Sequence, residues 1–68
     1  MGEYIENSVQ KHRNKKGWTQ ESLAEEVGVT RQTIIALEKG NYIPSVLLAM
    51  KIAKQFRLPV EEIFKLHL

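Results

Sequence analysis

The 68-residue sequence predicts an all-α fold of five short helices, and it leaves open a short β-ribbon between the chain ends. Residues 17–40 carry two consecutive sets of helix start and stop signals, and residues 45–56 carry apolar side chains at helical spacing. The chain has no cysteine, which excludes disulfides and Cys-based metal sites. A chain of this length lies near the lower limit for one self-sufficient core. We therefore expect a single domain over residues 1–68, and dimerisation would add to the stability of its small core.

The start of the first helix has two interpretations. Asn7 and Gln10 have the spacing of a capping box, which would start the helix at Ser8 and leave residues 3–6 extended. Alternatively the helix begins earlier and includes part of that segment. We favour the cap, and in both cases the helix is expected to end at Gly17, after two lysines that suit its C-terminal dipole.

Residues 19–39 are expected to form a helix-turn-helix hairpin. Thr19 is placed to N-cap the first of these two helices, and Gly28 to end it in the left-handed conformation that only glycine adopts without steric cost. Thr30 and Gly40 repeat the same two signals for the second helix. Two short helices joined by so tight a turn form the helix-turn-helix motif.

The second hairpin helix, residues 30–39, has an asymmetric face. At about 100° per residue, Ile34 and Leu37 fall on an inner side. The outer arc holds Arg31, Gln32, Ile35, Ala36 and Lys39. A guanidinium pairs with guanine, an amide with adenine, and an aliphatic group with a thymine methyl. This pattern predicts DNA binding, with Arg31, Gln32 and Ile35 reading bases; the alternative for Ile35 is an exposed side chain without a role.

Motifs spread over nearly the whole chain now resemble a known family. They are Thr19-Gln20, Leu23-Ala24, residues 27–34, residues 37–40, Pro44-Ser45 and residues 51–53. This run resembles the Cro/C1 repressor (Xre) family of helix-turn-helix regulators, especially its short one-domain members. The resemblance implies a lambda-repressor-like fold. It also implies a transcriptional regulator, typically a repressor, that binds double-stranded palindromic operator DNA as a homodimer.

The resemblance also suggests roles for residues around the hairpin. It implies that Arg13 pairs with Glu38, where the alternative is two independent surface charges. Phosphate contacts are expected from Thr19, Gln20, Thr30, Thr33, Lys39 and Asn41. Such contacts set the register on DNA and carry little sequence information. The two capping threonines could instead serve only as caps, and Thr33 could face the neighbouring helix.

Two further helices are expected near the C-terminus. Ser45 is placed to cap a helix that runs to about Phe56, and Pro59 suits the first turn of another, Val60 to about Phe64. Apolar residues cover about 200° of the longer helix, about twice what one core-facing stripe needs. A surplus of this kind suggests a partner. We expect a homodimer interface that includes Leu47, Met50, Leu66 and Leu68.

The tail, residues 64–68, alternates apolar and polar side chains. It could form a strand paired with residues 3–6. Fraying is the simpler expectation for a terminus.

Composition excludes several other classes. The sequence lacks aspartate and cysteine, and His12 lies far from His67 along the chain, so no catalytic constellation or metal site can be assembled. His12 is expected to be half-buried with one hydrogen-bond partner. No apolar run could span a membrane. We expect a cytoplasmic protein without cofactor, metal or small-molecule ligand; the competing interpretation is a protein-binding module of the same fold, such as an antitoxin or coactivator.

Overall fold

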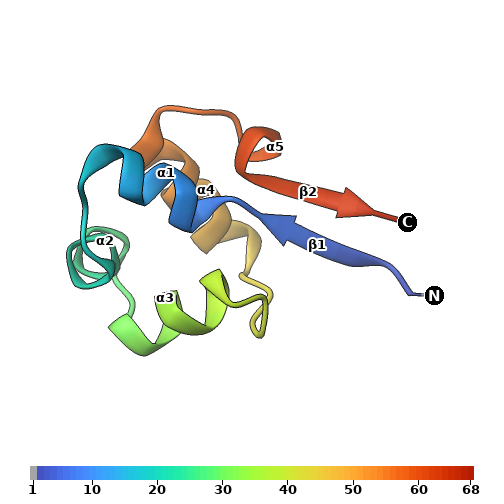
Figure 1. Cartoon of the computed structure of the whole chain (residues 1–68), viewed down its shortest axis with the longest axis horizontal. Coiled ribbons are helices and arrows are strands. Elements are labelled where there is room, and N and C mark those ends of the chain that lie inside the picture. The colour runs from blue at the N-terminus through green and yellow to red at the C-terminus, as the bar shows by residue number, and fades with distance from the viewer. Residues whose placement is uncertain (1) are drawn as a thin grey trace.

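The computed structural model describes residues 2–68, which fold into five helices and a two-stranded sheet. The elements are β1 (Tyr4–Asn7), α1 (Val9–Lys16), α2 (Gln20–Val27), α3 (Arg31–Glu38), α4 (Val46–Phe56), α5 (Val60–Ile63) and β2 (Phe64–His67). The helices form the body of the molecule, and the β1–β2 ribbon projects from it with both ends of the described chain at its far end (Figure 1). The expected helical fold is confirmed. No helix among residues 2–68 is long and apolar enough to cross a membrane.

The three predicted N-caps of the central helices are confirmed. The Thr19 hydroxyl accepts the Ser22 backbone N–H at 3.0 Å, and the Ser22 hydroxyl accepts the Thr19 N–H at 3.1 Å, which completes a capping box. Thr30 accepts the Thr33 N–H at 3.2 Å. Ser45 accepts the Leu48 N–H at 3.1 Å. These bonds satisfy backbone donors that a helix start otherwise leaves unpaired.

The core draws apolar side chains from all five helices. Its largest fully buried members are Val9, Leu23, Ile34, Leu37, Ile52 and Ile63. Trp18, between α1 and α2, stacks on Phe56 of α4 with ring centroids 5.1 Å apart. Because α2 and α3 both pack on this shared core, α3 is held in one orientation relative to the rest of the body.

The expected capping box at Asn7 is wrong. The N-cap of α1 is Ser8, and among residues 2–68 no hydrogen bond joins Gln10 to Asn7. Asn7 is instead the last residue of β1, and its Oδ1 accepts the Val9 N–H at 3.1 Å. The extended conformation expected for the preceding residues is confirmed from Tyr4 onward, because this segment pairs with the other end of the chain.

Fraying of the tail is also wrong. Strand β2 pairs antiparallel with β1 in the register Tyr4↔His67 to Asn7↔Phe64. Two side-chain contacts support the pairing: the Tyr4 and His67 rings stack at 4.8 Å, and His67 Nε2 lies 2.7 Å from Glu6 Oε1. Cross-strand pairs of this kind stabilise a ribbon that would be marginal alone. Helix α5 ends at Ile63, one residue early, because Phe64 already belongs to the strand.

Candidate nucleic-acid interface

Helix α3 exposes a polar face and buries an apolar one. Ile34 and Leu37 are completely buried, whereas Arg31, Gln32 and Lys39 are exposed. The remaining members of the expected outer arc, Ile35 and Ala36, are half-buried. Among residues 2–68, neither Arg31 nor Lys39 forms an ion pair, so both positive charges face solvent.

The two threonines at the start of α3 bond to each other. The Thr30 and Thr33 hydroxyl oxygens lie 3.1 Å apart, and Thr30 also caps the helix. Thr30 therefore serves as the N-cap of α3, which is one of the two roles expected for it. The Thr33 hydroxyl hydrogen-bonds to the Thr30 hydroxyl rather than to a neighbouring helix. Helix N-termini carry a partial positive charge that favours a phosphate nearby.

The start of α2 adjoins this end of α3 across an open groove. Thr19, Gln20 and Arg31 line the groove together with Gln10 of α1. The sequence pattern that predicts the interface does not include Gln10. Its position one turn before Arg13 on α1 could have identified it, because residues three apart share a helix face.

A buried ion pair holds the last turn of α3. Arg13 Nε donates to Glu38 Oε2 at 2.7 Å, and a second Arg13 nitrogen donates to Glu38 Oε1 at 3.1 Å. The third guanidinium nitrogen donates to the Trp18 carbonyl at 2.8 Å. The structure thus brings together the two residues that the resemblance paired. Their side chains are only 9% and 3% exposed.

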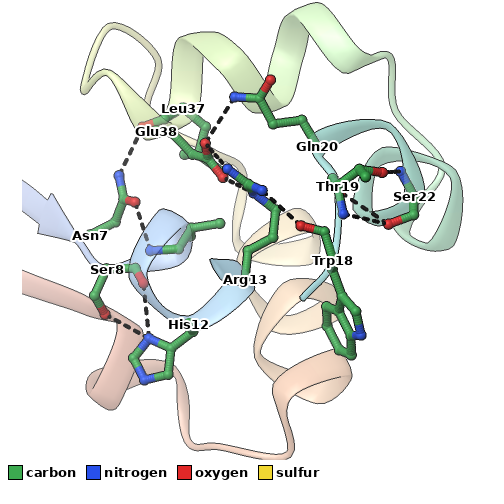
Figure 2. Close-up of polar contacts among 11 residues, drawn as sticks. Asn7, Ser8, His12, Arg13, Trp18, Thr19, Gln20, Ser22, Leu37 and Glu38 are labelled. Carbon is green, nitrogen blue, oxygen red and sulfur yellow. Dashed lines mark hydrogen bonds and ion pairs between the residues drawn. The ribbon is translucent and has the colours of Figure 1, made fainter. Parts of the chain in front are cut away.

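Gln20 joins the same cluster, which the sequence did not predict. Its amide nitrogen donates to Glu38 Oε1 at 3.0 Å from the side opposite Arg13 (Figure 2). The first residue of α2 is therefore tied to the last residue of α3. Only one amide hydrogen of Gln20 is used by this bond, so its second hydrogen and its oxygen remain for another partner.

The chain leaves α3 in a short loop with exposed polar residues. Both Lys39 and Asn41 are exposed, and the Asn41 backbone N–H donates to the Ala36 carbonyl at 2.9 Å. This bond holds the loop against the helix end, beside the exposed face of α3. An exposed eight-residue helix with Arg and Gln in its first turn, flanked by polar groups from α2 and this loop, suits the major groove of duplex DNA.

The four residues expected at a dimer interface are exposed. Leu47 and Met50 on α4 are 66% and 57% exposed, and Leu66 and Leu68 at the C-terminal end are 64% and 90% exposed. Ile43 and Val46, just before and at the start of α4, are equally open. Among residues 2–68, the structure therefore leaves a set of large apolar side chains open to solvent.

Both histidines have local partners. His12 is half-buried, as expected, and its Nδ1 lies 2.9 Å from the Ser8 carbonyl oxygen. Its ring lies 5.6 Å from that of Phe56, on the side of α1 away from Arg13 (Figure 2). His67 belongs to the ribbon and lies beside Glu6 and Tyr4.

The geometry has close counterparts in known proteins. A helix-turn-helix family model matches residues 9–63. The HTH-type transcriptional regulator YgzD of Bacillus subtilis is 52% identical over 63 residues, covering 93% of this chain and 96% of its own. An HTH-type transcriptional regulator of Methanothermobacter thermautotrophicus is 60% identical over 57 residues, covering 82% and 83% of the two chains.

Solved structures are similar over most of the chain. The restriction-modification controller protein C.AhdI of Aeromonas hydrophila superposes with a TM-score of 0.74 at 28% identity, covering 79% of this chain and 82% of its own. The N-terminal DNA-binding domain of SinR from Bacillus subtilis superposes with a TM-score of 0.71 at 24% identity, covering 78% of each chain. The second similarity concerns the fold alone.

Proposed function

The chain belongs to the helix-turn-helix family of Cro/C1-type transcriptional regulators, which bind DNA and are not enzymes. From this membership we propose that the protein is a sequence-specific repressor that binds palindromic operators as a homodimer. One observation carries the proposal. The inward-facing side chains of α3 are buried in the core or form the ion pair with Arg13. Arg31 and Gln32, in contrast, extend into solvent from its first turn. That is the arrangement that major-groove reading requires.

In this proposal α3 is the recognition helix. Arg31 donates two hydrogen bonds to a guanine, Gln32 pairs with an adenine, and the exposed part of Ile35 contacts a thymine methyl. Each good bidentate contact discriminates against a wrong base by about 1–3 kcal/mol. Ile35 is half-buried, so it offers only part of its side chain and is expected to contribute less than the two polar residues.

Phosphate contacts would surround this reading face. Lys39 supplies an exposed charge, and Asn41 lies exposed just beyond it. Thr19, Thr30 and Thr33 contribute hydroxyls at the starts of α2 and α3 while they serve local bonds. Gln20 would use the amide hydrogen that Glu38 leaves free. Such contacts position the protein on the duplex.

A homodimer would place two α3 helices on one face of DNA, with half-sites about 34 Å apart. The exposed apolar residues of α4 and the C-terminal end, Leu47, Met50, Leu66 and Leu68, support this assembly. A small domain gains stability when a second copy covers such residues.

The test is selection of bound duplexes from a random pool, followed by titration of the best site at several salt concentrations. We expect a palindrome, with Arg31→Ala and Gln32→Ala each losing preference at one defined base in each half-site. Lys39→Ala should weaken binding to all sequences and reduce the salt slope by about 1, because one phosphate contact is lost. Lys54→Ala removes the same charge from the last turn of α4 and serves as the control.

Absence of any enriched sequence would refute the proposal and direct the search to a protein partner. Sedimentation of the free protein and of the complex decides the homodimer separately. A monomer on an enriched but asymmetric site would leave sequence reading intact and refute the dimer.

A further inference from the structure

The side chain of Asn7 makes two bonds that point to different parts of the molecule. Its amide nitrogen donates to the Leu37 carbonyl at 2.8 Å, and its Oδ1 accepts the Val9 N–H at 3.1 Å (Figure 2). Its backbone meanwhile belongs to β1, opposite Phe64 of β2. One half-buried residue is therefore part of the ribbon, at the start of α1 and in contact with the end of α3.

The Leu37 carbonyl lies in the last turn of α3, where a helix leaves its carbonyls without intrahelical donors. This carbonyl also accepts the Gly40 N–H at 3.0 Å, the bond that turns the chain away from the helix. Leu37 itself is completely buried, so water does not replace a lost donor there without cost. Asn7 therefore hydrogen-bonds to the backbone at the position where α3 ends and the Lys39–Asn41 loop begins.

The bond to the Val9 N–H does not account for this geometry. It uses Oδ1 alone, and a serine or aspartate could provide the same acceptor. The amide hydrogen directed at Leu37 joins residues 30 positions apart in the sequence. Among the side-chain hydrogen bonds of residues 2–68, it is the only one that joins the β1–β2 ribbon to α3.

We propose that Asn7 is a positioning residue that couples the ribbon to the recognition helix, so that ordering of the ribbon sets where α3 ends. The effect on DNA rests on the proposed function, whereas the coupling itself does not. When β1 and β2 are paired, Asn7 is held in place and its amide supports the last turn of α3. When the pairing is lost, that support weakens, and with it the orientation of α3, which carries the proposed base-reading residues Arg31 and Gln32.

The first test measures amide hydrogen exchange in the full chain, in Asn7→Ser, in a chain lacking residues 65–68, and in the combination. Serine keeps an acceptor for the Val9 N–H but cannot reach Leu37. The deletion removes the pairing partners of Tyr4, Ile5 and Glu6. The readout is exchange at the Gly40 and Asn41 amides relative to the α4 amides, which corrects for any change in global stability.

In the wild-type background the deletion should speed exchange at these two amides about fivefold, the equivalent of one hydrogen bond. In the Asn7→Ser background the deletion should add less than about twofold, because the coupling is already broken. Equal effects in the two backgrounds would overturn the inference. If Asn7→Ser does not fold, Asn7→Asp replaces it, since aspartate keeps the acceptor for Val9 and lacks the donor.

The second test measures the ratio of affinities for the selected site and a scrambled site. Asn7→Ser should lower this ratio about fivefold. The matched control is Ser45→Ala, which removes the N-cap of α4 and leaves the ribbon and Asn7 untouched; its ratio should stay unchanged. An unchanged ratio in Asn7→Ser would refute the effect on recognition. If the wild-type protein prefers no sequence, the proposed function fails, and the exchange experiment still decides the coupling.

Discussion

Replacing Arg13 with methionine should remove a large part of the stability of the protein. The guanidinium is almost completely buried, and it donates to both Glu38 oxygens and to the Trp18 carbonyl. Without it the Gln20 amide is the only donor from residues 2–68 that the buried Glu38 carboxylate keeps. Leaving one partner of a buried ion pair alone costs about 3–5 kcal/mol. The total free energy of unfolding of a small domain is about 5–15 kcal/mol, so this loss is a large fraction of it.

The double variant Arg13→Met/Glu38→Leu separates two causes of that loss. With both charges removed, no uncompensated carboxylate remains in the core, and apolar side chains of similar volume fill the space. Replacement of a buried pair in this way is often nearly neutral. We expect the double variant to be more stable than Arg13→Met by about 2 kcal/mol or more. The Trp18 carbonyl and the Gln20 amide lose their partners in it, so full recovery is not expected.

Urea unfolding followed by fluorescence measures both quantities. Trp18 is the only tryptophan, and it stacks on Phe56 in the core, so its emission reports the loss of the native fold. Protomer concentration is held constant, because association would stabilise the folded state by mass action. A loss below about 1 kcal/mol in Arg13→Met would show that the pair is worth no more than an exposed one. A double variant no better than the single would show that the lost Trp18 bond, and not the orphaned carboxylate, sets the cost.

Three further predictions concern other positions. Gly28→Ala should lower the free energy of unfolding by about 1 kcal/mol in the same urea assay, because φ is +76° there although a Cβ would meet no atom within 4 Å. A neutral result would show that this turn does not need glycine. Arg57→Gly should raise stability by about 0.5–1 kcal/mol, because Arg57 ends α4 with φ at 57°; a loss would reveal a role for its side chain. Leu47→Glu should convert the proposed homodimer to a folded monomer in sedimentation and weaken binding to the selected DNA site, whereas a dimer that persists in this variant would place the interface elsewhere.

The helices could be predicted because their signals are local. Thr19, Thr30 and Ser45 each stand directly before an apolar helical pattern, and a side-chain cap needs only the next three residues. The inner and outer faces of α3 follow from helical geometry in the same way. The Arg13–Glu38 contact joins distant residues, and only the family resemblance suggested it. Neither periodicity nor spacing contains that information.

The ribbon could not be predicted with the same certainty, because strand pairing depends on residues at opposite ends of the chain. Alternation over residues 64–68 is compatible with a strand, but a strand is stable only with a partner, and the partner lies about 60 positions earlier. The error at Asn7 has the same origin. Its spacing to Gln10 is that of a capping box, but its backbone belongs to β1 and its side-chain amide donates to the Leu37 carbonyl of α3. The bond of Gln20 to Glu38 has no local signal either, so the sequence predicts only a phosphate contact for Gln20.

The position of α3 therefore depends on elements other than itself. Eight residues are too few for an independently stable helix, so its order must come from tertiary contacts. The core holds Ile34 and Leu37, while Arg13 and Gln20 hold Glu38 and Asn7 holds the Leu37 carbonyl. These supports act mainly on the last turn of the helix, whereas the proposed base-reading residues are in the first. A helix anchored at its C-terminal end and capped by Thr30 at the other presents Arg31 and Gln32 at a defined angle while leaving their side chains free to adjust to the bases. Substitutions among the supports should therefore change how all half-site positions are read together, whereas substitutions at Arg31 or Gln32 should change one position at a time.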